Sequence, residues 1–128
     1  LRGVRSLPLR SFQASANALR LAQLLESQEK VEWVRYPGLP SHPDYAVASR
    51  LIEGPGGGML AFQPRGGVAG MAAFTDHLAL CDIGVSLGDI FTLVYPQPKR
   101  GGLIRVSVGC ETIDDLVDDF ALGLSFVG

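Results

Sequence analysis

The segment Leu103–Val108 reads Leu-Ile-Arg-Val-Ser-Val, and this alternation is typical of a β-strand with two unlike faces. Successive side chains of a strand point to opposite sides, so Ile104, Val106 and Val108 share one face. Branched aliphatic side chains on one face need a second layer of structure to bury them. The opposite face carries Arg105. The sequence therefore predicts a sheet that is covered on one side and displays an arginine on the other.

Four segments have the character of helices and can supply the covering layer. Helices are predicted over 6–29, 44–52, 68–78 and 111–124. In the three longer segments the apolar residues recur at threes and fours, which gathers them on one helical face. Pro8 is tolerated only in the first turn of a helix, so we expect the first helix proper to begin near residues 7–9.

Short runs of β-branched and aromatic residues predict strands between these helices. The predicted strands cover 31–36, 59–63, 83–87, 91–95 and 103–108, with breaker-rich loops at 37–43 and 54–58. Because helices and short strands alternate without an internal repeat, we expect one α+β domain over residues 1–128, built as a two-layer α/β sandwich with helices on one side of the sheet. We expect one core cluster between the layers, formed by Leu19, Trp33, Phe62, Phe74, Leu116 and Phe120.

The composition narrows the classes of function. With 47% hydrophobic residues, 19% charged residues and a net charge of −2, the chain is neither disordered nor broadly phosphate-binding. No apolar run approaches the ~20 residues that cross a bilayer, and two cysteines do not make a disulfide framework. We therefore expect a soluble cytoplasmic domain that binds neither nucleic acid nor membrane. The sequence lacks an initiator methionine, which suggests that it is part of a longer chain.

Arg105 is the first candidate for a functional side chain. A guanidinium fixed on a strand presents a planar fork that suits a carboxylate or a phosphate. The alternative is an exposed arginine, or an internal ion pair with an acidic side chain. The turn from Gly84 to Asp89 can aim Ser86 or its neighbouring amides at a ligand, whereas the alternative is a turn with only a structural role. Ser86 has no partner base in view, so it is not expected to act as a nucleophile.

Other chemically reactive side chains form no recognisable constellation. His42 and His77 lie far apart and no Cys-x-x-Cys pair is present, so no spacing of metal ligands can be argued. Lys30 and Lys99 both lie in predicted turns, where an amine is not desolvated as a catalytic lysine would be. We expect no catalytic residue and no metal site in this chain.

Five segments follow one another in a set order, and a sixth continues the series at the end. They are Arg2–Arg10 with Asn17-Ala18, Val34–Pro43, Gly57–Leu60, Val85–Gly88, Leu103–Gly109 with Glu111, and the tail Asp114–Asp119. Together they resemble the C-terminal domain of the Cys/Met-metabolism family of pyridoxal-phosphate enzymes, which includes cystathionine γ-synthase and γ-lyase, methionine γ-lyase and O-acetylhomoserine sulfhydrylase. One such segment would be weak, but the ordered set is specific.

The resemblance implies a fold and a role for two residues. The fold is the small domain of fold-type I enzymes, a largely antiparallel sheet with helices on one side. In the family the arginine that matches Arg105 binds the α-carboxylate of the amino-acid substrate, and the serine that matches Ser86 lies beside it and helps to hold that carboxylate. The cofactor, pyridoxal 5'-phosphate, acts as an electron sink on a lysine of the larger domain. The resemblance therefore implies no catalytic and no cofactor-binding residue in this chain.

The implied activity belongs to the parent enzyme. It is a lyase or sulfhydrylase reaction, a β- or γ-elimination or replacement on cysteine, homocysteine, methionine or an O-acylated homoserine. The chain alone is expected to be inactive, and its implied partners are its own N-terminal cofactor-binding domain and the other subunits of a homotetramer. The alternative is a free-standing module that holds a small carboxylate through Arg105 without catalysis.

The sequence departs from the family pattern at two places near the implied site. Phe91 stands where many members carry a glutamate, so a carboxylate near the side-chain end of the substrate is replaced by an aromatic ring. Residues 95–102 cross directly to the strand that bears Arg105, where most members have a longer loop with a Pro-Ala-Ser-Met-Thr-His segment. A shortened wall implies a more open entrance for the substrate.

Overall fold

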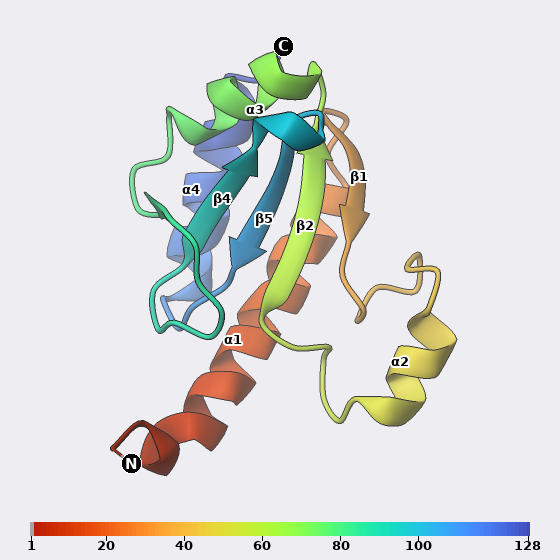
Figure 1. Ribbon diagram of the computed structural model, residues 1–128, viewed down its shortest axis with the longest axis vertical. Helices are drawn as coiled ribbons and strands as arrows, with labels where there is room; N and C mark the ends of the chain where they lie inside the picture. Colours follow the sequence, from red (N-terminus) through yellow and green to blue (C-terminus); the bar gives the residue numbers. More distant parts are fainter. Residues whose placement is uncertain (1) are drawn as a thin grey trace.

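A mixed sheet of five strands in the order β1-β2-β5-β4-β3 forms one layer of the computed structural model, which describes residues 2–128 (Figure 1). Its strands are β1 (Val31–Arg35), β2 (Met59–Pro64), β3 (Asp82–Ile83), β4 (Leu93–Gln97) and β5 (Leu103–Ser107). The pairs β1–β2, β2–β5 and β5–β4 are antiparallel, and only the short β3 runs parallel to its neighbour β4. The expected open and largely antiparallel sheet is therefore confirmed.

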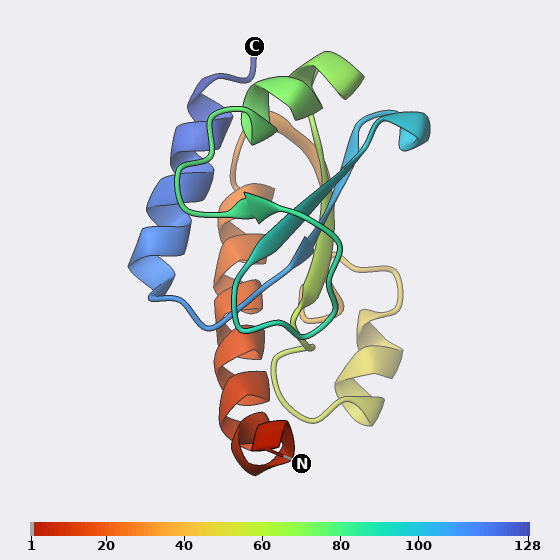
Figure 2. The same cartoon turned by 60° about the vertical axis from the view of Figure 1, so that its left-hand side comes forward.

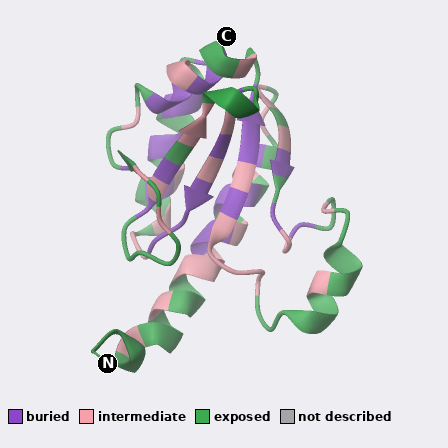
Figure 3. Ribbon diagram, viewed as in Figure 1, coloured by how far each residue is buried: buried purple, intermediate pink, exposed green. Residues whose placement is uncertain are grey.

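Three helices form the second layer. Helices α1 (Arg2–Glu26), α3 (Gly67–Thr75) and α4 (Ile113–Ser125) pack on one face of the sheet (Figure 2). Helix α2 (Tyr45–Leu51) stands apart from this layer and buries none of its residues, and the first half of α1 is also largely exposed (Figure 3). The α+β two-layer architecture is confirmed, with one face of the sheet left without helices. Within residues 2–128 no helix is long and apolar enough to cross a membrane.

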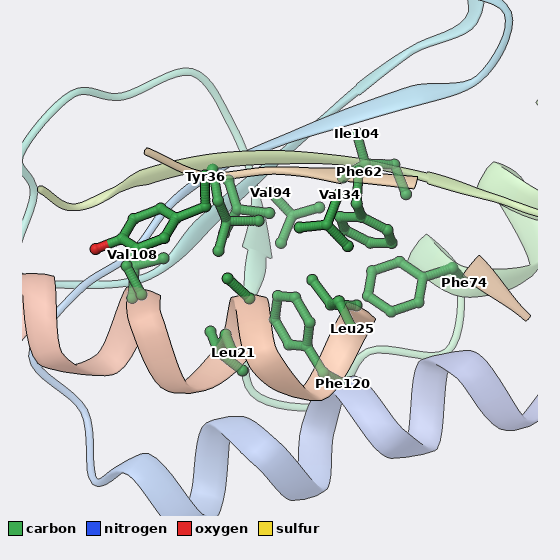
Figure 4. Packing of buried hydrophobic residues seen from close by; sticks show 14 of the residues in the cluster. Leu21, Leu25, Val34, Tyr36, Phe62, Phe74, Val94, Ile104, Val108 and Phe120 are labelled. Atoms are coloured by element: carbon green, nitrogen blue, oxygen red, sulfur yellow. The ribbon is translucent and has the colours of Figure 1, made fainter. Parts of the chain in front are cut away.

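The core lies between the sheet and the three helices. Phe62 from β2, Phe74 from α3 and Phe120 from α4 form an aromatic cluster in which ring centres lie 5.2 to 6.2 Å apart. Leu21 and Leu25 project into the same layer from α1 (Figure 4). The predicted core positions of Phe62, Phe74, Leu116 and Phe120 are confirmed, and Leu19 packs against this cluster while partly buried.

Trp33 does not join the core, so that prediction was wrong. In the β1–β2 register Val34 pairs with Phe62 and Trp33 pairs with Gln63. Because neighbouring residues of a strand face opposite sides, burying Val34 against the helices turns Trp33 to the uncovered face. There the guanidinium carbon of Arg35 lies 5.1 Å from the centre of the indole ring.

Helix α1 begins at Arg2 and contains Pro8, so the predicted start near residues 7–9 was also wrong. Proline lacks the N–H that would donate to the preceding turn. The side chain of Arg10 spans these turns, since its Nη2 donates to the carbonyl of Gly3 at 2.6 Å and its Nε donates to Ser6 Oγ at 3.1 Å. These bonds help to hold the first turns in helical form despite the proline.

The strand predicted over 83–87 is mostly a loop. Only Asp82 and Ile83 pair with β4, and Gly84 N–H makes a further hydrogen bond to Val94 O at 3.0 Å. Beyond this point Val85 and Leu87 are exposed, so their apolar side chains have no buried face to join. The chain re-enters the sheet at Leu93, two residues later than predicted.

Candidate functional site

The uncovered face of the sheet carries a row of side chains from four strands. The Cα register places Arg35 opposite Ala61, Ala61 opposite Arg105, and Arg105 opposite Tyr95. Directly paired residues project to the same face, so this row crosses β1, β2, β5 and β4. Ala61 is the smallest member of the row, and it leaves the space above the sheet beside Arg105 clear of a long side chain.

Arg105 is half-buried, and its guanidinium makes one hydrogen bond and one contact with an aromatic ring. Its Nη2 donates to the carbonyl of Ser86 at 3.3 Å, and its central carbon lies 5.5 Å from the centre of the Tyr95 ring. Its Nε is buried and has no hydrogen-bond partner within residues 2–128. None of these contacts involves a carboxylate, so they do not support the internal ion pair that the sequence left open. An unpartnered buried N–H is costly, and it marks a donor that an incoming acceptor can satisfy.

The structure brings Ser86 to Arg105, as expected, but through an unexpected atom. The contact uses the main-chain carbonyl of Ser86, whereas the resemblance had pointed to the serine as a direct holder of the ligand. The loop that carries it is tied to β5 a second time, because Gly88 N–H donates to Ser107 Oγ at 3.3 Å. Ser86 thus lies where it orients the guanidinium.

A buried polar network holds this loop from its far end. The carboxylate of Glu111 accepts from Thr92 N–H at 2.7 Å and from Thr92 Oγ1 at 2.8 Å, and Gly109 N–H donates to the same Oγ1 at 2.9 Å. The side-chain amide of Asn17 on α1 donates to the carbonyls of Gly109 and Glu111 at 3.1 and 2.8 Å. Sequence reasoning assigned no role to these residues, although Asn17, Gly109 and Glu111 all belong to the segments that carry the resemblance.

The two departures from the family pattern flank the candidate site. Phe91 is 64% exposed on the loop between β3 and β4, and its N–H donates to Asp89 Oδ1 at 3.2 Å. The connection from β4 to β5 is a single turn of 3₁₀ helix, η1 (Pro98–Arg100), closed by Gly101 with φ +73°. The crossing is therefore as short as the sequence indicated.

Several comparisons with known proteins agree with this fold. The family model described as "Cys/Met metabolism PLP-dependent enzyme" matches residues 1–101. An L-methionine gamma-lyase of Pseudomonas deceptionensis is 41% identical over 93% of this chain and 34% of its own length. An O-acetyl-L-homoserine sulfhydrylase of Leptospira meyeri is 38% identical over 93% of this chain and 31% of its own length.

A solved structure shares the arrangement of helices and strands. The crystal structure of cystathionine gamma synthase from Xanthomonas oryzae pv. oryzae, in complex with aminoacrylate and cysteine, superimposes with a TM-score of 0.91 at 33% identity. The match covers 98% of this chain and 36% of that one. The fold is therefore that of one part of a pyridoxal-phosphate enzyme. The chain belongs to the family of Cys/Met-metabolism PLP-dependent enzymes, as its motifs indicated, and spans about a third of the length of the relatives it matches.

The two lysines within residues 2–128 lie in surroundings unlike those of a lysine that forms a Schiff base. Lys30 is half-buried in the turn before β1, where its Nζ donates to the carbonyl of Ser125 at 3.2 Å. Lys99 is exposed on η1. Neither amine lies in the desolvated pocket in which a lysine is activated to form a Schiff base. The two histidines make contacts with other residues of the chain. His42 Nδ1 accepts from Asp44 N–H, and the His77 ring stacks on Phe126.

Proposed function

We propose that this chain is the C-terminal small domain of a pyridoxal-phosphate-dependent enzyme of sulfur amino-acid metabolism, and that Arg105 holds the α-carboxylate of the substrate. The observation that carries the proposal is the guanidinium on the uncovered sheet face, whose buried Nε has no hydrogen-bond partner and whose contacts include no carboxylate among residues 2–128. A carboxylate is the acceptor that matches the planar fork of an arginine. The proposed reaction is a β- or γ-elimination or replacement, of the lyase or sulfhydrylase type.

The surroundings of Arg105 support binding with a defined orientation. The carbonyl of Ser86 takes one N–H of Nη2, and the Tyr95 ring limits where the guanidinium can lie. An arginine has five N–H donors, so the rest of the fork remains for a ligand. Ser86 is proposed to act at this site with Arg105, chiefly by fixing the plane in which the fork presents its donors. The chain's own contribution is thus to bind and orient the substrate.

The cofactor and the catalytic lysine are proposed to come from a larger N-terminal domain of the same enzyme, which as a whole is proposed to be a cytoplasmic homotetramer. Large exposed apolar side chains support an interface with that domain. Leu9 and Phe12 on α1 are 76% and 71% exposed, and Val85 and Leu87 beside Ser86 are 67% and 81% exposed. Large exposed apolar side chains are typical of a surface that another part of the protein covers.

The test is the substitution Arg105→Lys in the full-length enzyme. Lysine keeps the charge but cannot make two parallel hydrogen bonds from one plane. We therefore expect kcat/KM to fall by a factor that corresponds to a loss of about 2–5 kcal/mol in binding free energy. If the carboxylate is bound equally in the ground and transition states, KM rises while kcat changes little. The absorbance of the bound cofactor is expected to stay unchanged, since none of its contacts are proposed to come from this chain.

Arg20→Lys is the matched control, because Arg20 is exposed on the opposite layer of the fold. Steady-state kinetics of both variants decide the question. A normal kcat/KM for Arg105→Lys would contradict the proposal and leave Arg105 with a structural role only.

A further inference from the structure

The loop that carries Ser86 is residues 84–92, between β3 and β4, and little apolar material within residues 2–128 holds it in place (Figure 1). Its large apolar side chains are all exposed: Val85, Leu87, Ile90 and Phe91. A segment with few buried apolar contacts changes conformation easily unless hydrogen bonds restrain it. The hydrogen bond of 3.3 Å from Arg105 Nη2 to the Ser86 carbonyl therefore needs a loop that polar contacts hold.

Thr92 makes such contacts at the end of the loop. Its N–H and its hydroxyl both donate to the carboxylate of Glu111, at 2.7 and 2.8 Å. The same hydroxyl oxygen accepts from Gly109 N–H at 2.9 Å, and Cys110 N–H donates to the carbonyl of Ile90 at 2.8 Å. Because Thr92 is buried, its polar groups depend on these protein partners. A side chain without the hydroxyl would lose one bond to Glu111 and leave Gly109 N–H without its acceptor.

The turn to which Thr92 binds, residues 109–111, is itself fixed by α1. The side-chain amide of Asn17 donates to the carbonyls of Gly109 and Glu111 at 3.1 and 2.8 Å. Its oxygen accepts from Gln13 Nε2 at 2.9 Å, which sets the orientation of the amide. A Cβ added at Gly109 would collide with the carbonyl oxygen of Ile90, so the turn and the loop lie in close contact. The network therefore connects the loop to the helical layer of the fold.

The other connections of the loop are weaker. Before Ser86, Gly84 N–H donates to the carbonyl of Val94 at 3.0 Å, and after it Gly88 N–H donates to Ser107 Oγ at 3.3 Å. Each is a single hydrogen bond between neutral groups, whereas Thr92 makes two hydrogen bonds to a carboxylate, which are roughly twice as strong. We therefore expect the whole loop to shift when the bonds of Thr92 are lost, and the Ser86 carbonyl to shift with it.

We propose that Thr92 and Glu111 are positioning residues for the α-carboxylate of the substrate. They hold the loop 84–92 against the turn after β5, and this keeps the Ser86 carbonyl on Arg105 and the guanidinium in one plane. The inference rests on the proposed function, since it takes Arg105 as the group that binds the carboxylate. Neither Thr92 nor Glu111 is proposed to touch the substrate, so their effect is confined to ligands that carry the carboxylate.

The substitution Thr92→Val in the full-length enzyme tests this role, because valine has nearly the shape of threonine and lacks the hydroxyl. Dissociation constants are measured for an unreactive amino-acid analogue and for the corresponding amine without the α-carboxylate. Their ratio, amine over amino acid, is the carboxylate preference. We expect Thr92→Val to lower this preference about threefold to tenfold, the range for the loss of one buried hydrogen bond, and to leave amine binding unchanged. In turnover we expect KM to rise while kcat and the absorbance of the bound cofactor stay the same.

Two matched variants separate positioning from a general loss of stability. Thr92→Ser keeps the hydroxyl and is expected to keep the carboxylate preference. Thr75→Val makes the same chemical change at another buried threonine, whose Oγ1 donates to the carbonyl of Met71 within α3 at 3.0 Å. It is expected to leave the preference unchanged, even where its thermal midpoint falls as far as that of Thr92→Val. If Thr92→Val yields no folded enzyme, Glu111→Gln replaces it with the same expectation, since an amide oxygen can accept only one of the two bonds from Thr92.

A thermodynamic cycle with Arg105→Lys shows whether Thr92 acts through the guanidinium. If it does, Thr92→Val has no further effect on the carboxylate preference once Arg105 is lysine. An unchanged preference in Thr92→Val, an equal weakening of both ligands, a loss that Thr92→Ser shares, or a loss that persists in the Arg105→Lys background would each overturn the inference while the proposed function stands. A preference that Arg105→Lys itself leaves unchanged would contradict the proposed function, and this inference would fail with it.

Discussion

Replacing Phe120 by alanine tests how the two layers of the fold are held together. Phe120 lies on α4 with none of its side chain exposed. Its ring centre is 5.3 Å from that of Phe74 at an interplanar angle of 72°, and 6.2 Å from that of Phe62. These contacts join α4, α3 and β2, so the substitution removes material from the point where the three elements meet.

The expected magnitude follows from the buried area. A buried phenylalanine of this kind removes about 150–200 Å² from water, which at about 25 cal/mol per Å² corresponds to ~4–5 kcal/mol. Alanine keeps the Cβ buried, while the cavity left behind adds to the loss, so we expect Phe120→Ala to cost about 3–5 kcal/mol. This is a large fraction of the ~5–15 kcal/mol by which domains of this size are stable.

Urea unfolding followed by circular dichroism measures this loss. Leu122→Ala is the control on the same helix, because Leu122 is 42% exposed and its truncation should cost about 1 kcal/mol or less. A loss below about 1 kcal/mol for Phe120→Ala would refute the packing argument, since it would mean that α4 does not bury this face against the sheet.

Three further predictions concern imine formation with pyridoxal phosphate, the pH dependence of stability, and the glycines of the turn between β4 and β5. With pyridoxal phosphate the 128-residue chain should form no stoichiometric imine that borohydride can trap, because Lys30 and Lys99 lie outside any desolvated pocket; site-specific labelling with turnover of an amino acid would contradict this. Burial acts to raise the pKa of Asp119, but hydrogen bonds from the N–H groups of Ala79, Cys81 and Leu80 outweigh it and hold that pKa below its ordinary value. Asp119 therefore stabilises the fold at neutral pH, and its contribution is lost as the pH falls through the lowered pKa. Asp119→Asn should cost about 1–3 kcal/mol at pH 7 and flatten the acid limb of a series of urea titrations, whereas an unaltered acid limb would refute the assignment. Gly102→Ala should destabilise more than Gly101→Ala in thermal melts: both glycines have positive φ, but only the added Cβ at Gly102 meets the backbone of Gly67, and equal losses would show that this approach is not tight.

Local pattern was sufficient to predict the face on which Arg105 lies. The alternation of Leu103–Ser107 depends only on strand geometry, and Ile104 and Val106 are fully buried on the helix side. The same reasoning placed Trp33 on the wrong face, because the residue type of an aromatic side chain does not determine which face of a strand it takes. Its neighbour Val34 lies opposite Phe62, and this pairing across strands sets the face of Trp33.

Contacts between distant parts of the chain were beyond reach of the sequence pattern. Arg105 donates to the main-chain carbonyl of Ser86, a group that every residue has, so no side-chain motif can predict the contact. The network of Asn17, Thr92 and Glu111 likewise depends on how α1 packs beside the turn after β5. Pro8 was misjudged because the hydrogen bonds of Arg10 across the first turns are a feature of side-chain conformation, which periodicity does not describe.

The most direct test of the account is a thermodynamic cycle that removes the guanidinium from the enzyme and the carboxylate from the ligand. Dissociation constants are measured for an unreactive amino-acid analogue and for the corresponding amine without its α-carboxylate, on the unaltered full-length enzyme and on Arg105→Lys. If Arg105 holds the carboxylate, the substitution lowers the binding free energy of the amino-acid analogue by about 2–5 kcal/mol and leaves that of the amine unchanged. The reason is that removing the guanidinium and removing the carboxylate each abolish the same interaction. Equal weakening of both ligands would contradict the account, since Arg105 would then affect binding without contacting the carboxylate.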